Sequence, residues 1–255
     1  MLVDLNCDMG ESFGHYNLGD DETMLRTVTS ANIACGLHAG DPVVMARTVG
    51  LAKRNRVSVG AHPGYPDLQG FGRRDMELSA NELESILIYQ IGALAGFVRT
   101  AGIPLVHVKL HGALYNTVAR NAALAETVAR AIVAFDPRLV VIALPVSALE
   151  KAARTLNLRV AREGFADRAY RADGTLVPRS EPGAVIHDPI QAADQAVRMV
   201  TRNEVETIDG RVIPLRIETI CIHSDTPGAA CIATEARGAL ESAGVEVVPL
   251  TKVLG

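Results

Sequence analysis

Short apolar runs recur along the chain, and each is followed by a turn and a longer segment with helical periodicity. Seven of these runs have the length and composition of strands. They are Leu2–Leu5, Ala31–Ala34, Val57–Val59, Leu105–Val108, Leu139–Leu144, Leu158–Ala161 and Ile217–Ile222. Strands alternating with helices are typical of a parallel sheet covered by helices. The pattern therefore predicts an α/β fold, a seven-stranded (β/α) barrel, with a doubly wound open sheet as the alternative.

The helices between these strands carry start signals. An Asp, Ser or Thr side chain accepts the free amide hydrogens of a first turn, and proline fits at the first helical position. Three pairs predict such starts: Asp41-Pro42, Asp188-Pro189 and Thr226-Pro227. Ser79 and Glu82 form a capping box before a helix that should end near Thr100.

Two segments interrupt the alternation of strands and helices. Gly164–Gly183 is polar and contains glycine and proline, whereas Glu204–Leu215 is centred on Asp209-Gly210 and predicts a hairpin. We expect both to be excursions near one rim of the barrel. Because the chain shows no linker, low-complexity tract or internal repeat, we expect residues 1–255 to form a single barrel domain.

Composition and charge exclude several classes of function. The formal charge of −4 and the scattered arginines offer no basic field for a nucleic acid. No apolar stretch is long enough to span a membrane, and the N-terminus lacks the pattern of a secretory signal. Its four cysteines lie far apart and predict neither a disulfide framework nor a thiolate zinc site. These features indicate a reduced, cytoplasmic protein.

Polar side chains follow the apolar runs, at the strand ends where α/β folds place their ligands. In DLNCDMGE, alternation sends Asp4, Asn6 and Asp8 to one face of the first strand, and Glu11 follows in the turn. Burial of several carboxylates is costly unless they meet a cation, a protonated partner or a substrate. We therefore favour a functional role over a structural one for this group.

The next two clusters add histidines and arginines. Asn32 and His38 lie in NIACGLHAGDP, where a glycine-flanked histidine is a candidate ligand or acid-base group. His62 and Arg73 lie in GAHPGYPDLQGFGRRD. An arginine there fits a carboxylate or phosphate, and a surface ion pair is an equal alternative. Cys35 is more simply a small buried apolar residue.

The remaining clusters follow later strands. HVKLHGALYN places Lys109 and His111 on one strand face, and a buried lysine there requires a carboxylate such as Asp4, Asp8 or Glu163. His107, further inside, is interpreted as a hydrogen-bonded core histidine. EGFADRAY and CIHSDTPGA follow the last two strands and add Glu163, Asp167, Arg168 and His223.

Taken together, these six motifs resemble the LamB/YcsF family, which supplies the A component of prokaryotic 5-oxoprolinase, nearly end to end. The resemblance implies a barrel related to polysaccharide deacetylases. It also implies B and C partner subunits, with which the A component cleaves 5-oxoproline to glutamate with hydrolysis of ATP, bound with Mg²⁺. The chain departs from the family pattern at Leu110 and Ser224, where proline and glycine are usual. These departures affect the details of the substrate more than the class of reaction.

The hypothesis for the site follows from the motifs and the resemblance. Asp8, Glu11, His38 and His62 are assigned to water activation or cation binding, Lys109 to the lactam oxygen or a phosphate, and Arg73 to the substrate carboxylate. The candidate catalytic residues are Asp8, Glu11, His38, His62, Lys109 and Glu163. The candidate substrate-binding residues are Asn6, Asn32, Arg73, His111, Asp167, Arg168 and His223, and the metal candidates are Asp8, His38 and His62.

Two other functions fit the same residues. A metal-dependent amide deacetylase would work alone, without ATP. A non-catalytic subunit would only capture a small acid. No GxxxxGK[ST] loop is present, so the sequence does not locate an ATP site, and a homo-oligomer is left open.

Overall fold

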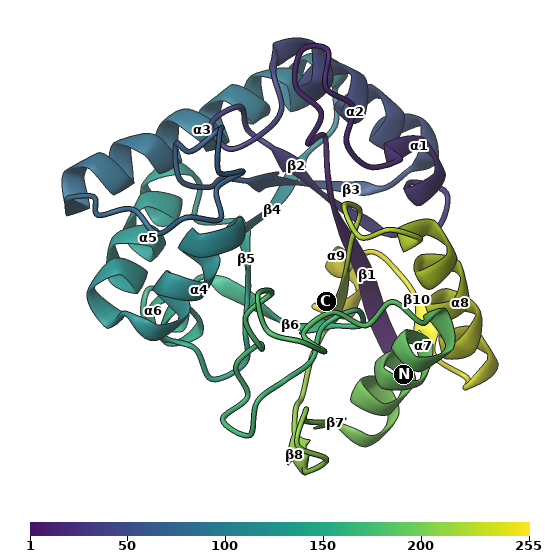
Figure 1. Cartoon of the computed structure of the whole chain (residues 1–255). Helices are drawn as coiled ribbons and strands as arrows, with labels where there is room; N and C mark the ends of the chain where they lie inside the picture. Colours follow the sequence, from purple (N-terminus) through teal and green to yellow (C-terminus); the bar gives the residue numbers. More distant parts are fainter.

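The computed structural model describes residues 1–255 and contains a closed barrel of seven parallel strands surrounded by helices (Figure 1). The barrel order is β1-β2-β3-β4-β5-β6-β9, and the pairing of β9 with β1 closes it. Its strands are β1 (Leu2–Met9), β2 (Ser30–Ala34), β3 (Ser58–His62), β4 (Leu105–Lys109), β5 (Val140–Ala143), β6 (Arg159–Phe165) and β9 (Thr219–His223). The predicted barrel is confirmed, and the open sheet is wrong.

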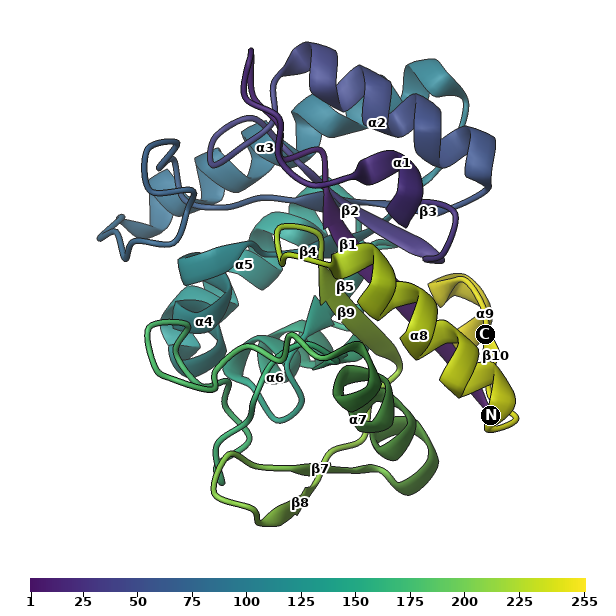
Figure 2. The ribbon, with the colours of Figure 1, turned by 45° about the vertical axis from the view of Figure 1, so that its right-hand side comes forward.

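Helices cover the outside of the barrel (Figures 1 and 2). They are α1 (Asp21–Met24), α2 (Pro42–Asn55), α3 (Ala80–Ala101), α4 (Gly112–Arg120), α5 (Ala122–Phe135), α6 (Ala148–Thr155), α7 (Pro189–Arg202), α8 (Ala229–Ser242) and α9 (Leu250–Val253). The predicted starts of α2, α3 and α7 are correct, because Asp41, Ser79 and Asp188 each cap the helix that follows. None of these helices is long and apolar enough to cross a membrane.

The start of α8 was predicted wrongly. The helix begins at Ala229 after Gly228, not at Thr226-Pro227. The Thr226 hydroxyl donates to Asp167 instead of capping a helix, at 3.2 Å. The chain therefore makes a further turn before the helix, and Gly228 takes the left-handed conformation at its N-cap.

Of the barrel strands, β1 and β6 extend furthest beyond the apolar runs that predicted them. β1 continues to Met9 and β6 to Phe165, so Asp8 and Glu163 lie inside strands rather than after them. Polar residues end an apolar run in the sequence, but inside this barrel they pair with one another and the strands continue.

Both predicted excursions exist, but they occupy different places. The hairpin of β7 (Glu204–Glu206) and β8 (Val212–Pro214) contacts the first excursion through the Ile208 amide, which donates to the Tyr170 carbonyl. Only the first excursion, through Thr175–Ser180, borders the main cavity. The hairpin therefore lies against the first excursion but does not line the cavity.

The barrel interior is polar along much of its length and apolar at one end. Leu250 of α9 packs with Val140, Ile142 and Ala161 at the end where β5 begins. A tenth strand, β10 (Glu246–Val247), pairs with the start of β1 and leads into α9. The larger apolar core lies between the barrel and its helices, so hydrophobic burial outside the barrel offsets the cost of polar groups inside it.

Candidate active site

Lys109 lies at the centre of a buried polar network inside the barrel. Its ammonium lies 2.9 Å from Asp8 Oδ1 and 3.0 Å from Glu163 Oε1. It also lies 2.9 Å from Cys221 Sγ. The three partners come from β1, β6 and β9, so this one side chain contacts strands across the barrel from β4. The sequence-based expectation that Lys109 meets a carboxylate is met by Asp8 and Glu163, and not by Asp4.

Asparagine and tyrosine side chains complete the network around the two carboxylates. Asn32 donates to Asp8 Oδ1 at 2.8 Å, and Asn6 donates to Glu163 Oε1 at 3.0 Å. The Tyr115 hydroxyl donates to Glu163 Oε2 at 2.9 Å. With these partners both carboxylates are held in fixed orientations, as a preorganised site requires.

Charge pairing decides the protonation of the central groups. Burial opposes ionisation of Asp8, but His62 and Lys109 outweigh it and hold the pKa of Asp8 well below its usual range. Burial likewise opposes the charge of Lys109, but the carboxylates of Asp8 and Glu163 raise the pKa of Lys109 well above its usual value. Both groups are therefore ionised at neutral pH.

Asp4 lies one layer deeper, away from the lysine. It accepts hydrogen bonds from Thr29, Ser30 and Thr219. Burial is the main cause that raises its pKa from 3.8 to about 6. Asp4 supports the floor of the network and does not reach the cavity.

His107 also faces this interior. Its Nε2 lies 2.7 Å from Asn32 Oδ1, and burial lowers its pKa to about 3. Gly60 leaves room for the ring, because a Cβ at that position would overlap the imidazole of His107. The interpretation of His107 as a hydrogen-bonded core histidine agrees with the contact of its Nε2, whereas its buried Nδ1 has no hydrogen-bond partner.

A cluster of three histidines and one glutamate lies beside Asp8. His62 Nε2 is 3.4 Å from Asp8 Oδ2, and His111 Nδ1 is 3.5 Å from Glu11 Oε1. His38 stacks on His111 with ring centroids 3.8 Å apart. All four side chains are buried. Burial and the negative charge of Asp8 raise the pKa of Glu11 well above its usual range.

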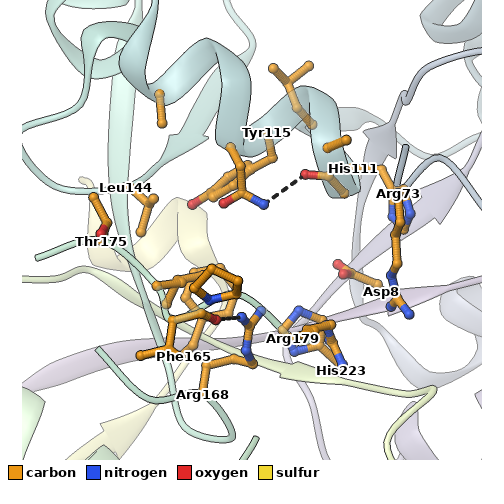
Figure 3. Close-up of a pocket in the computed structure, with 18 of the residues that line it drawn as sticks. Asp8, Arg73, His111, Tyr115, Leu144, Phe165, Arg168, Thr175, Arg179 and His223 are labelled. Carbon is orange, nitrogen blue, oxygen red and sulfur yellow. Dashed lines mark hydrogen bonds between the residues drawn. The ribbon is translucent and has the colours of Figure 1, made fainter. Parts of the chain in front are cut away.

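An open cavity of about 530 Å³ lies above these groups (Figure 3). Asp8, His62, Lys109 and His111 contribute to its floor, and Tyr115 and Phe165 to its walls. This volume is in the usual range for small-molecule sites. The cavity therefore gives a small ligand access to the carboxylates, the ammonium and the imidazoles.

Four arginines border the same cavity: Arg73, Arg120, Arg168 and Arg179. Arg73 lies 2.6 Å from Asp225 Oδ2, so the residue predicted to bind the substrate carboxylate is already in an ion pair. Arg168 donates to the carbonyl oxygens of Ala184 and Val177. Arg179 lies 3.8 Å from Asp225, and its buried Nη2 has no hydrogen-bond partner. Arg179 is therefore better placed than Arg73 to bind an anion.

His223 forms the last part of the wall. Its Nδ1 lies 3.0 Å from both carboxylate oxygens of Asp167, and its ring stacks on Phe165. Asp167 is fully buried and does not border the cavity, so it orients His223 rather than touching a ligand. This corrects the prediction that Asp167 binds the substrate directly.

The structure brings together most of the residues that the motifs predicted. Asn6 and Asn32 lie beneath the cavity floor and act through Asp8 and Glu163. Sequence reasoning missed the contributions of Arg179, Phe165 and Cys221. Phe165 could have been found by continuing the sixth strand past its apolar run, and Cys221 because it alternates with His223 on the last strand. Arg179 lies in a loop, where no local pattern indicates that a side chain reaches the cavity.

Ser224, one of the two departures from the family pattern, has a visible role. Its hydroxyl donates to the carbonyl oxygen of Asp8 at 2.6 Å. This bond ties the loop after β9 to the end of β1. The serine therefore supports the strand that presents Asp8.

Comparisons with known proteins agree with this architecture. A sequence model of the LamB/YcsF family matches residues 3–255. The chain is 53% identical over 255 residues to a Pyrococcus abyssi protein named as the A subunit of 5-oxoprolinase, with both chains fully covered. A solved structure named lactam utilization protein, from Thermus thermophilus, superposes with a TM-score of 0.93 at 49% identity, covering 97% of this chain and 99% of that one. A solved structure of a mutant CE4 family pseudoenzyme superposes with a TM-score of 0.50 at 12% identity, covering 100% of this chain and 67% of that one. This likeness shows the fold alone.

Proposed function

Because the chain belongs to the LamB/YcsF family, we propose that it is the A component of a 5-oxoprolinase that opens the lactam ring of 5-oxoproline to give glutamate. The observation that carries the proposal is the full-length similarity to a relative that bears this name. The proposal includes B and C partner subunits and consumption of ATP by the complex.

The chemistry of the cavity supports this substrate. A lactam is a poor electrophile, and transfer of the γ-phosphoryl group of ATP to its carbonyl oxygen, with release of ADP, makes the ring carbon open to attack by water. Water adds to that carbon, the ring C–N bond breaks with a proton passing to the nitrogen, and a second water releases phosphate from the resulting acyl phosphate. In the proposal, the Lys109 ammonium stabilises negative charge on that oxygen or its phosphate. Asp8, Glu11, His38 and His62 surround the place where water is activated.

The substrate carboxylate is assigned to the arginine side of the cavity. Arg179 has a buried, unpartnered Nη2 on this side, and Arg73 lies close by in its pair with Asp225. A carboxylate arriving there would supply the missing acceptor and share the positive charge of the two guanidinium groups. In the proposal, the lactam carbonyl then lies toward Lys109, which lines the same cavity as the two arginines (Figure 3 shows Arg73 and Arg179).

The test is to reconstitute the chain with its candidate B and C partners and to measure glutamate from 5-oxoproline with and without ATP. We expect ATP-dependent glutamate from the complex and none from the chain alone. Arg179→Gln should raise KM for 5-oxoproline by at least about tenfold, a loss of about 1.4 kcal/mol. Arg171→Gln, a change at an exposed ion pair, is the matched control. Absence of glutamate from the fully assembled complex would overturn the proposal.

A second function is favoured by the histidine cluster. An amide hydrolase acting alone through a bound metal would use the same floor residues without ATP. It predicts chelator-sensitive hydrolysis of amides by the chain in the absence of partners. Binding of 5-oxoproline with no turnover in the assembled complex would instead indicate a capture subunit.

A further inference from the structure

One ring nitrogen of His62 faces one ring nitrogen of His111 at hydrogen-bond distance. His62 Nδ1 lies 2.8 Å from the Lys109 carbonyl oxygen, and His111 Nε2 lies 2.8 Å from the Phe71 carbonyl oxygen. A carbonyl oxygen only accepts, so each of these nitrogens carries a hydrogen. The other two nitrogens, His62 Nε2 and His111 Nδ1, lie 3.0 Å apart. In neutral rings both carry lone pairs, which repel at this distance unless a cation lies between or beside them.

Carboxylates converge on the same two nitrogens. Glu11 Oε1 lies 3.5 Å from His111 Nδ1, and Asp8 Oδ2 lies 3.4 Å from His62 Nε2. Glu11 is only 5% exposed, and its Oε1 has no hydrogen-bond partner. A buried carboxylate oxygen without a partner is costly, so this oxygen also calls for a cation.

We infer that His62 Nε2, His111 Nδ1 and Glu11 Oε1 bind a divalent transition-metal ion at the floor of the cavity, with Asp8 Oδ2 adjacent as a fourth ligand. Ligands at about 2.1 Å from a tetrahedral ion lie about 3.4 Å apart. The separations of His111 Nδ1 from His62 Nε2 and from Glu11 Oε1, 3.0 and 3.5 Å, and of His62 Nε2 from Asp8 Oδ2, 3.4 Å, are close to that value. The ligand atoms of Glu11, His62 and His111 all lie within 4.8 Å of one another. Imidazole and carboxylate together suit Zn²⁺ or a similar first-row ion better than Mg²⁺ or Ca²⁺.

The surroundings have the form of a second coordination shell. Each histidine in the set uses its other nitrogen to donate to a backbone carbonyl, which fixes the tautomer with a lone pair toward the ion. Gly72 permits this packing, because a Cβ there would lie 2.9 Å from His111 Cδ2. The loop carrying Phe71 therefore approaches closely enough to orient His111.

His38 is placed beside the ion rather than on it. Its ring is nearly parallel to that of His111, at an interplanar angle of 5° and a centroid distance of 3.8 Å. An ion in the plane of the His111 ring therefore lies outside the plane of the His38 ring, although a ring nitrogen of His38 lies within 4.8 Å of the ligand atoms of Glu11, His62 and His111. By contrast, the rings of His62 and His111 meet at 89°, so their planes intersect and one ion can lie in both.

The neighbouring group of Asp8, Cys221 and His223 is a poorer candidate. It also brings three potential ligand atoms within 4.8 Å of one another. However, the Lys109 ammonium lies 2.9 Å from both Cys221 Sγ and Asp8 Oδ1, so a dication there would face a fixed positive charge. The proposed ion instead lies on the side of Asp8 that faces away from Lys109.

A bound divalent ion would supply a Lewis acid at the cavity floor. Asp8 then links it to Lys109, since one carboxylate oxygen faces each positive group. This arrangement accounts for the buried carboxylates by balancing them with two cationic groups. The inference concerns binding by the isolated chain, so it can fail while the proposed 5-oxoprolinase function holds, and the reverse.

The experiment uses untagged chain, stripped with a chelator and then equilibrated with Zn²⁺ or Co²⁺. We expect one Zn²⁺ per chain by elemental analysis after gel filtration, and visible absorption from Co²⁺ typical of coordination by four or five ligands. His111→Asn and Glu11→Gln should each weaken Co²⁺ binding by at least about tenfold. His187→Asn, at an exposed histidine, is the matched control and should bind as the wild type does.

Circular dichroism of each variant separates loss of a ligand from loss of the fold. Because Glu11→Gln keeps the size of the side chain, it provides a second variant if His111→Asn does not fold. The inference is overturned if the wild-type chain retains no Zn²⁺ and shows no Co²⁺ absorption, since a shared proton would then hold the two imidazoles together. It is equally overturned if folded Glu11→Gln and His111→Asn both bind Co²⁺ as the control does.

Discussion

Replacement of Lys109 by methionine should cost more stability than almost any other single change. Methionine keeps most of the stem and removes the ammonium, which lies 2.9 Å from Asp8 and 3.0 Å from Glu163. The change leaves two carboxylates that are at most 5% exposed without their common counter-charge. Removal of one partner from a buried ion pair typically costs about 3–5 kcal/mol. This is a large share of the roughly 5–15 kcal/mol by which a domain is stable.

The loss should be measured as the free energy of unfolding in urea, followed by circular dichroism because the chain contains no tryptophan. Lys151→Met, at an exposed position on α6, is the matched control and should change stability by less than about 0.5 kcal/mol. Adding Glu163→Gln to Lys109→Met removes one of the two carboxyl groups that have lost the ammonium, and should restore about 1–3 kcal/mol of the free energy of unfolding. A loss below about 1 kcal/mol for Lys109→Met would refute the reasoning, because it would mean that the two buried carboxyl groups do not depend on the ammonium of Lys109.

Three further outcomes follow from individual contacts. Asp4 has its pKa raised from 3.8 to about 6, so its contribution to folding stability is fully present below pH 3.8 and is lost as pH rises through 6. The stability of the wild type relative to Asp4→Asn should therefore fall by up to about 3 kcal/mol between pH 4 and pH 8. Urea titrations that give the same difference at every pH would contradict this. Tyr115→Phe removes a hydrogen bond to Glu163 and should lower the free energy of unfolding in urea by about 1–3 kcal/mol. The circular dichroism spectrum of the native state should stay unchanged. A variant as stable as the wild type would show that Glu163 does not need this donor. Ser224→Gly removes the bond to the Asp8 carbonyl and should cost about 1 kcal/mol, with kcat of the reconstituted complex within about threefold of the wild type; a much larger fall in kcat would show that Ser224 touches the substrate.

The sequence was most informative where the barrel strands impose a period of two. Alternation placed Asp4, Asn6 and Asp8 on one face of the first strand, and His107 with Lys109 on one face of the fourth. It also limited the carboxylates that could meet the lysine to three. The choice among those three depends on depth in the barrel, because Asp4 lies one layer below Lys109. Depth follows from strand stagger, which no single strand sequence encodes.

Loop contacts were beyond prediction for a different reason. Arg73 and Asp225 are separated by 152 positions, and their pairing depends on how two loops meet above the barrel. The same holds for Asp167 with His223 and for the arrival of Arg179 at the cavity. A motif shows which residue types a loop carries, but the partner of a long side chain is set by tertiary packing. This is why the sequence assigned the substrate carboxylate to Arg73, whereas our proposal assigns it to Arg179.

The division between strands and loops has a consequence for specificity. Asp8, Lys109 and Glu163 are fixed by three barrel strands and by hydrogen bonds on nearly every polar atom, so they cannot move far without breaking the network. The arginines come from loops, and two of them share a single aspartate, Asp225, as their counter-charge. An anion that binds Arg179 competes only with a 3.8 Å contact, so reorganisation at that side costs little. We infer that the strands determine which bond is attacked and the loops determine which acid is held, so that changes at Arg179 should alter KM while changes at Lys109 alter kcat.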